Sequence, residues 1–171
     1  MTTQTALLLL TTETPLHAGA GQSVAGIDLP IQREVHTDWP CVYGSAVKGA
    51  LRAHAHHLSY GKEDLTDLFG PDHAAAAGER DSSHAGALLV GDALLLALPV
   101  RSLQSCFKWV TCPAALQRFG RTAARLGLGL GLPTAPIPAR DEALGNGDAK
   151  LCLEEFRFKQ SASPITDALA K

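Results

Sequence analysis

Two ionisable side chains in a glycine-rich stretch are the residues of this sequence best suited to chemistry. His17 precedes Gly19 and Gly21, and Asp28 follows Gly26. Glycine lets a backbone turn tightly or approach a ligand closely. A carboxylate can accept a proton or hold a divalent metal ion, and an imidazole can donate a proton or contact a phosphate. A loop aspartate often only caps a turn, and a histidine at a strand end often only bonds to the backbone, so these ordinary roles stay open.

Two cations follow at helical spacing. Lys48 and Arg52 are four residues apart in a predicted helix from about Ser45 to Ser59, so they share one side of it. Backbone N–H groups at the start of the helix, with Gly44 and Ser45, favour a phosphate. The pattern therefore predicts a phosphate contact through Gly44, Ser45, Lys48 and Arg52, although a solvated charged face is the commoner role of such a pair.

The elements that must position these residues alternate between strands and helices. An apolar run from Ala6 to Leu10 predicts a strand buried on both faces. After the first helix we expect a short helix at Glu63–Phe69, then strands within 87–90 and 93–100, a helix after Pro113, and a strand within 151–158 that has a bulge at Glu154-Glu155. This order indicates an α+β fold of the ferredoxin-like or RNA-recognition-motif type, with room for missing or inserted elements.

Length and composition limit the organisation and the class of function. The chain predicts a single domain over residues 1–171, with a long mobile loop at 127–149 that is rich in glycine and proline. The net charge of −2 does not indicate a dedicated nucleic-acid-binding protein, so any RNA contact must come from a local patch. The cysteines form no Cys-x-x-Cys pair, which argues against a structural zinc site. The Leu7–Leu10 run is too short to cross a bilayer, and we expect a cytoplasmic protein with reduced thiols and no membrane partner.

Two further groups of side chains could bind a ligand. His54, His56 and His57 cannot all face one ion from a single helix, so we expect an incidental cluster. Phe107 and Trp109 could stack on a base, but packing in the core is the expected role.

Three segments in this order resemble a known family. They are His17-Ala18-Gly19-Ala20-Gly21, Ile27-Asp28-Leu29-Pro30-Ile31-Gln32-Arg33-Glu34 and Gly44-Ser45-Ala46-Val47-Lys48-Gly49-Ala50-Leu51-Arg52, and Pro99-Val100-Arg101-Ser102 and Trp109-Val110-Thr111-Cys112-Pro113 match further on. On these residues the chain resembles the RAMP proteins of CRISPR systems, in particular the multi-copy backbone subunit of type III-B (Cmr) effector complexes. Members of that family are longer, and their C-terminal part, with a second glycine-rich loop, has no counterpart before Lys171.

The resemblance implies a function in antiviral defence as well as the ferredoxin-like fold. It implies a metal-dependent endoribonuclease that binds guide RNA (crRNA) and cleaves complementary target RNA to a 2′,3′-cyclic phosphate and a 5′-hydroxyl. Asp28 occupies the position of the catalytic aspartate and would also hold Mg²⁺ or another divalent metal, and His17 is the second catalytic candidate. The helix with Lys48 and Arg52 would grip the guide backbone. Copies of the chain and other effector-complex subunits would be its protein partners.

Two other functions stay open. The chain could be a catalytically inactive scaffold that binds guide RNA, because the C-terminal part of the family supplies site residues and packing. It could also be a small-molecule-binding α+β module that uses the glycine-rich loop for a phosphate group. No GxxxxGK[ST] fingerprint supports that second alternative.

Overall fold

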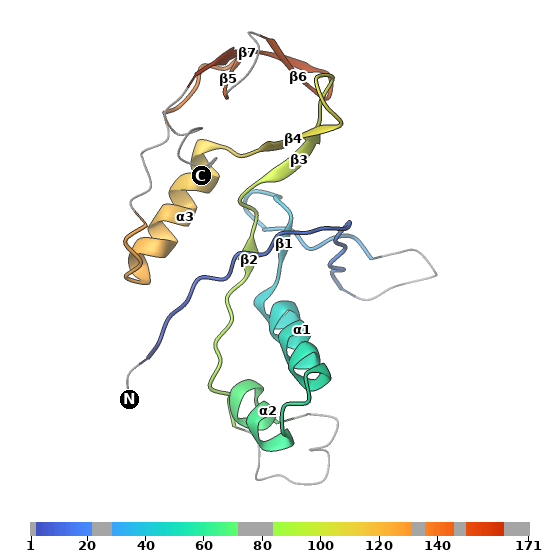
Figure 1. Ribbon diagram of the computed structural model, residues 1–171, viewed down its shortest axis with the longest axis vertical. Helices are drawn as coiled ribbons and strands as arrows, with labels where there is room; N and C mark the ends of the chain where they lie inside the picture. The colour runs from blue at the N-terminus through green and yellow to red at the C-terminus, as the bar shows by residue number, and fades with distance from the viewer. Residues whose placement is uncertain (1–2, 22–28, 72–83, 131–135, 146–149, 163–171) are drawn as a thin grey trace. The chain divides into compact units, whose positions relative to one another are not determined.

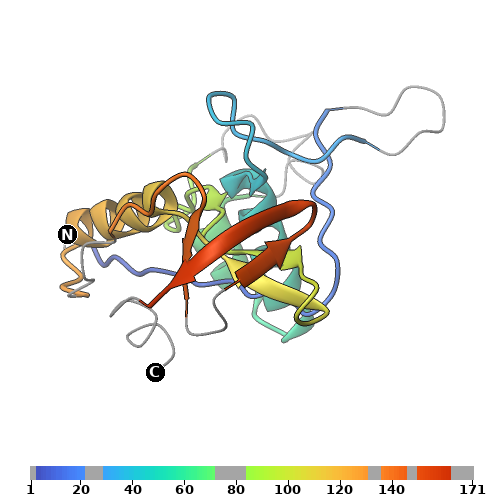
Figure 2. The same ribbon diagram turned by 90° about the horizontal axis from the view of Figure 1, so that it is seen from above.

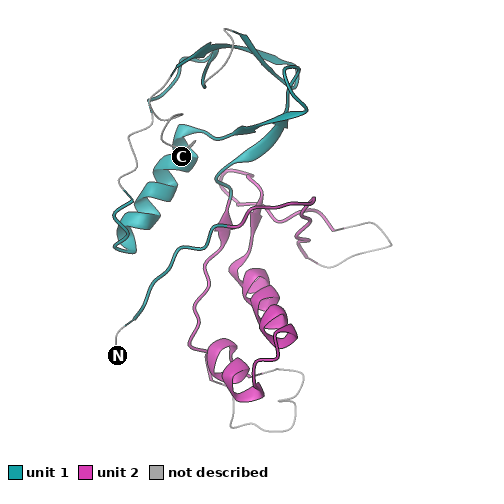
Figure 3. Ribbon diagram, viewed as in Figure 1, with its two compact units in different colours: residues 1–9, 95–171 teal, residues 10–94 magenta. Residues whose placement is uncertain are grey.

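The structure, a computed structural model, describes residues 3–21, 29–71, 84–130, 136–145 and 150–162. It divides into two compact units, one of residues 10–94 and one of residues 1–9 and 95–171 (Figure 3). Both units mix helices with short strands (Figure 1), which confirms the predicted α+β class. The sheets of the described residues hold two or three strands each. The finer ferredoxin-like arrangement and the single domain therefore stay predictions.

Two helices and one strand pair build the unit of residues 10–94. They are β1 (Cys41–Val42), α1 (Gly44–His57), α2 (Lys62–Phe69) and β2 (Ala93–Leu94), with β1 antiparallel to β2. Both helices lie where helical spacing predicts them. The strand expected within 87–90 does not form. Instead the amides of Ala87 and Leu88 donate to carbonyl oxygens near the end of α2, at 2.8 and 2.9 Å, and so satisfy acceptors that a helix end leaves open.

The second unit holds the remaining described elements. They are β3 (Leu98–Arg101), β4 (Phe107–Val110), α3 (Pro113–Arg125), β5 (Glu142–Leu144), β6 (Lys150–Leu153) and β7 (Phe156–Ser161). β3 and β4 form an antiparallel hairpin. β7 lies between β5, which it pairs with in parallel, and β6, which it pairs with antiparallel; Figure 2 shows this sheet from above. Glu154 has a φ of 49°, and the chain reverses there, so the predicted bulge is a hairpin turn.

Two expectations from the sequence are wrong, because a strand forms only where another strand pairs with it. The stretch 127–149, predicted as a loop, contains β5, which is too short to show a period and forms because β7 supplies its hydrogen bonds. The Ala6–Leu10 run, predicted as a buried strand, pairs with no strand among the described residues. Its side chains at Leu8, Leu9 and Leu10 are 59%, 65% and 58% exposed.

The interior of each unit is small and partly polar. Its buried hydrophobic residues are Cys41, Val47 and Leu65 in the first unit and Ala115, Ala123 and Leu153 in the second. The buried residues of α1 are Gly44 and Val47, and His54 is exposed. Gln32, Glu34 and Ser102 are buried as well. Because buried polar groups need hydrogen-bond partners, these three mark places where the chain is held in a specific arrangement.

Candidate functional site

A short antiparallel stem closes the base of the glycine-rich loop. It consists of residues 18–20 and 30–32, with Gly19 and Ile31 facing each other across a bridge. Backbone hydrogen bonds of 2.7 and 2.8 Å join its two sides. The stem therefore holds both ends of the segment that contains Asp28.

The structure places one of the two predicted catalytic residues. Asp28 lies outside the described residues, so its catalytic and metal-binding roles stay predictions. Nε2 of His17 lies 2.7 Å from the carbonyl oxygen of Leu29, which is the residue after Asp28 in the chain. A carbonyl oxygen only accepts hydrogen bonds, so we assign the proton to Nε2, which leaves Nδ1 as an acceptor in the neutral ring. His17 is exposed.

A buried glutamine joins this stem to helix α1. Gln32 is 7% exposed. Its Nε2 donates to the carbonyl oxygen of Gly19 at 2.8 Å, and its Oε1 accepts from the backbone N–H of Tyr43 at 2.7 Å. Tyr43 is the N-cap residue of α1. One side chain thus connects the base of the loop to the start of the helix.

Glu34, two residues after Gln32, has a buried carboxylate. Oε2 of Glu34 accepts from the Thr37 hydroxyl at 2.6 Å and lies 3.6 Å from Nε2 of His36. The pKa of the nearby Cys41 thiol is raised, mainly because burial disfavours the thiolate and further because the carboxylates of Glu34 and Asp92 repel it. Cys41 therefore lacks the lowered pKa of a nucleophilic cysteine.

The first amide of α1 already has an anionic partner. The backbone N–H of Gly44 donates to Oδ1 of Asp92 at 2.7 Å. A carboxylate at this end of a helix interacts favourably with the helix dipole. Gly44 also has no room for a side chain, because a Cβ there would collide with the carbonyl oxygen of Val90. A phosphate at the start of α1 would thus have to compete with Asp92 for the Gly44 amide.

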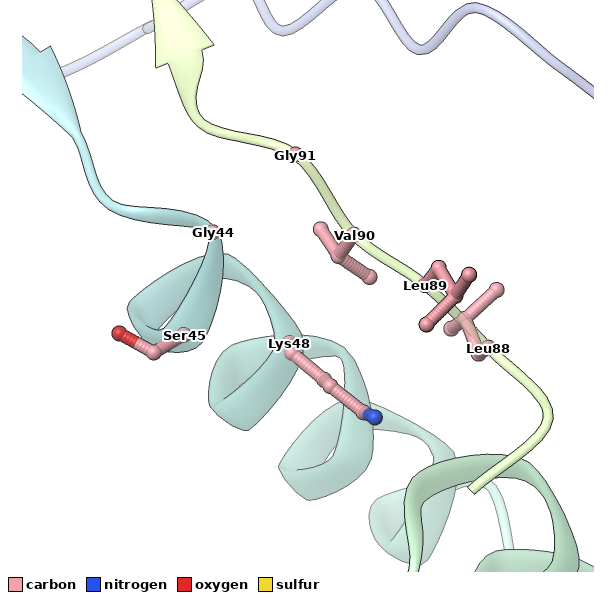
Figure 4. A pocket seen from close by; sticks show the side chains of 7 residues that line it. All are labelled: Gly44, Ser45, Lys48, Leu88, Leu89, Val90 and Gly91. Carbon is pink, nitrogen blue, oxygen red and sulfur yellow. The ribbon is translucent and has the colours of Figure 1, made fainter. Parts of the chain in front are cut away.

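A shallow groove runs between α1 and the segment 88–91. Its volume is about 450 Å³, and it is lined by Gly44, Ser45, Lys48, Leu88, Leu89, Val90 and Gly91 (Figure 4). Figure 4 shows the Lys48 side chain extending along the groove, whereas the Ser45 hydroxyl points away from the segment 88–91. No ion pair among the described residues involves Lys48. Lys48 is therefore a cation that a passing anion could reach.

Arg52 lies one turn further along α1 and already holds a partner. Its Nη1 donates to the carbonyl oxygen of Gly70 at 2.9 Å. Gly70 is the C-cap residue of α2, with a φ of 89°. An arginine at the end of a helix satisfies a carbonyl and interacts favourably with the dipole. Arg52 thus ties α1 to α2, and only its remaining N–H groups could contact RNA.

The structure also describes the two other groups of side chains that could bind a ligand, which are the α1 histidines and the pair Phe107 and Trp109. In the described part of the chain, no group of three or more His, Cys, Asp or Glu side chains could hold a metal ion. The expectation that Phe107 and Trp109 pack in the core is wrong, because these residues are 49% and 54% exposed. Their rings meet edge to face, with centroids 5.9 Å apart. The β3–β4 hairpin leaves this face of β4 uncovered.

The sequence-based search missed two groups of residues. Gln32 and Glu34 had no assigned role, because Arg33 lies between them and nothing in the local sequence marks them as buried. Arg118, Arg121 and Arg125 share one side of α3 at spacings of three and four, and they line a hollow of about 430 Å³. Arg118 donates to the carbonyl oxygen of Leu95 at 3.1 Å, and Arg125 lies 3.4 Å from the Thr122 hydroxyl.

Within the ranges described, no helix is long and apolar enough to cross a membrane.

Known proteins are similar to this chain in sequence. A family model described as the RAMP superfamily matches residues 9–165. The CRISPR system Cmr endoribonuclease Cmr4 of Pyrococcus furiosus is 36% identical over 155 residues, which cover 88% of this chain and 50% of that protein. The chain thus spans about half the length of the curated relative that it matches.

Solved structures give the same likeness. The crystal structure of oligomeric Cmr4 from Pyrococcus furiosus superposes with a TM-score of 0.65 at 31% identity, over 90% of this chain and 54% of that one. A cryo-EM structure of the type III-B Cmr-beta complex bound to cognate target RNA superposes with a TM-score of 0.62 at 22% identity, over 86% and 55%. At that lower identity the likeness concerns the fold alone.

Proposed function

The chain belongs to the RAMP superfamily, and on this basis we propose that it is a backbone subunit of a type III-B CRISPR effector complex, which binds guide RNA and cleaves complementary target RNA. The observation that best supports this function is the link through Gln32. It connects the stem that flanks the Asp28 segment in the chain to the start of the helix that presents Lys48. Copies of the chain and other effector subunits are the protein partners in this proposal.

Guide RNA would run along the groove beside α1. Lys48 would contact a phosphate as a point charge. Such contacts position a strand without reading its sequence, which suits a guide of any sequence. Arg52 contributes less in this arrangement, since it is already bound to Gly70. The Gly44 amide already donates to Asp92 and is not free for a phosphate. Lys48 is therefore the main phosphate-binding group of the proposed path.

Cleavage would use the nucleophile that RNA carries. The 2′-hydroxyl oxygen attacks the adjacent phosphorus in line, while Asp28 accepts the hydroxyl proton. The bond from phosphorus to the 5′-oxygen breaks as the cyclic phosphate forms. His17 in its imidazolium form gives the Nδ1 proton to the leaving oxygen, while Nε2 stays bonded to the Leu29 carbonyl oxygen. In the alternative role, Asp28 would hold a divalent ion such as Mg²⁺, which would neutralise charge on the phosphate, in place of accepting the proton.

The test combines purified protein, a guide RNA and a labelled complementary RNA, with and without Mg²⁺. Asp28→Asn keeps the shape of the side chain and removes its charge. We expect it to lower the cleavage rate by about 100-fold or more, the usual contribution of general acid–base catalysis, and to leave guide binding unchanged. Asp38→Asn is the matched control, because the Asp38 side chain is 85% exposed and its φ of 60° suits asparagine equally well.

The outcomes separate two functions. Cleavage at the wild-type rate by Asp28→Asn would overturn the catalytic role of Asp28. Guide binding without any cleavage by the wild-type chain would favour the inactive scaffold.

A further inference from the structure

The Gln32 side chain is the point at which the glycine-rich loop and α1 are joined. We infer that Gln32 is a positioning residue, which fixes the stem on either side of the Asp28 segment relative to the start of α1 and the proposed RNA path. This inference rests on the proposed function, in which Asp28 acts on a strand held at Lys48. Gln32 itself need not touch RNA, because its side chain is buried.

The position requires a donor and an acceptor on one side chain. Gly19 offers a carbonyl oxygen, and Tyr43 offers an N–H. An amide satisfies both groups at once, whereas an ionised glutamate has only acceptors and a leucine has neither. An asparagine is one methylene shorter and cannot span the same two partners. Among these side chains only glutamine keeps both ends of the link.

The backbone of Gln32 makes separate bonds that do not depend on its side chain. Its N–H donates to the carbonyl oxygen of Ala18 at 2.7 Å, and its carbonyl oxygen accepts from the N–H of Cys41 at 3.0 Å. Replacing the side chain therefore leaves the stem and the approach to β1 connected. The expected loss is one of alignment between loop and helix rather than of the fold of this unit.

Alignment matters because in-line attack tolerates little displacement. A misplacement of about 1 Å far from the reacting atoms can slow a reaction by about 100-fold. A phosphate contact through a flexible lysine is far less demanding. Loss of the Gln32 link should therefore reduce cleavage strongly and guide affinity little.

The first test compares Gln32→Glu and Gln32→Leu with the wild type in single-turnover cleavage and in guide binding. We expect cleavage to fall by about tenfold to 100-fold and guide affinity to change by less than about twofold. Gln117→Glu, on the exposed side of α3, is the control with the same change of charge. Wild-type cleavage in both Gln32 variants would overturn the inference, and so would a loss of guide affinity as large as the loss of cleavage.

The pH profile of Gln32→Glu separates alignment from a purely structural role. A carboxylate oxygen would repel the Gly19 carbonyl oxygen, but a protonated carboxyl can donate to it and still accept from Tyr43. Burial raises the pKa of a glutamic acid above its ordinary value of about 4.3. The cleavage rate of Gln32→Glu relative to wild type should thus rise as the pH falls from about 8 to about 5.5, while the ratio for Gln117→Glu stays flat. A flat ratio for Gln32→Glu would count against the inference.

Hydrogen exchange tests the inference even if the wild-type chain does not cleave RNA, which would be a failure of the proposed function alone. In Gln32→Leu the Tyr43 amide loses its acceptor and should exchange at least about tenfold faster, since an unpaired amide exchanges through small local openings. The amides of α3 should keep their rates. Unchanged exchange at Tyr43 would show that Gln32 does not hold the start of α1.

Discussion

Helices α1 and α3, one in each unit, both carry cations along one side, but they use them differently. In α1, Arg52 is bound to Gly70, whereas Lys48 lies along a groove without an ion-pair partner among the described residues. In α3, Arg118 and Arg125 both donate within the unit, and Arg121 is exposed. A row of basic residues is therefore weak grounds for an RNA surface until their existing partners are known.

The starts of the two helices differ as well. α1 begins beside the buried Gln32, and its first amide is bound by Asp92. Neither N-cap side chain, Tyr43 in α1 or Cys112 in α3, makes a capping hydrogen bond, but α3 begins at Pro113. Proline is suited to this position, because its missing N–H would have no partner in the helix. Within the described residues, Gln32 connects the start of α1 to the stem of the glycine-rich loop.

The largest expected difference between the helices lies in RNA affinity. Lys48→Glu replaces a reachable cation by an anion and should weaken guide binding by about tenfold to 100-fold at low salt, as expected for loss of one charge-assisted hydrogen bond. Arg121→Glu makes the same change of charge on α3 and should have little effect. Filter binding or fluorescence anisotropy at two salt concentrations measures both variants. Equal losses would mean that α3 also faces the RNA.

Arg52 distinguishes a structural cation from a binding one. Arg52→Ala removes the bond to Gly70 between α1 and α2 and should lower the free energy of unfolding by about 1 kcal/mol, the usual net value of a hydrogen bond. Arg121→Ala should change it by less than about 0.5 kcal/mol, as exposed substitutions do. Urea denaturation measures both. A stable Arg52→Ala chain with strongly weakened RNA binding would instead return Arg52 to the phosphate-binding role that its spacing predicts.

The smallest expected effect is that of Asp92→Asn, which should lower stability and raise guide affinity. Asp92→Asn keeps an oxygen for the Gly44 amide but removes a negative charge from the start of α1. Stability should fall by about 0.3–1 kcal/mol, the usual value of a charge at a helix end. Guide affinity should rise by about two- to threefold, because phosphate no longer meets a like charge there. Weaker guide binding by this variant would place the RNA away from the start of α1.

Local patterns in the sequence determined the helices and the family. The spacing of apolar residues and the proline and glycine positions define α1, α2 and α3, because helical hydrogen bonds join residues only four apart. The run from Ile27 to Glu34 carried the resemblance to RAMP proteins, which the match over residues 9–165 confirms. The side shared by Lys48 and Arg52 also follows from spacing alone.

Only the tertiary structure decided which of these side chains are already in use. Asp92 binds the Gly44 amide from 48 residues away, and Gln32 reaches Gly19 and Tyr43 across 13 and 11 residues. β5 forms on β7, and Phe107 and Trp109 are exposed, because pairing and coverage depend on distant segments. Each of these outcomes rests on a partner far away in the chain, which a local pattern cannot contain. Residue spacing therefore identifies which residues share one side of a helix, and the local sequence identifies the Ile27–Glu34 motif. Long-range hydrogen bonds decide which cations and amides are left without a partner inside the protein and could bind RNA.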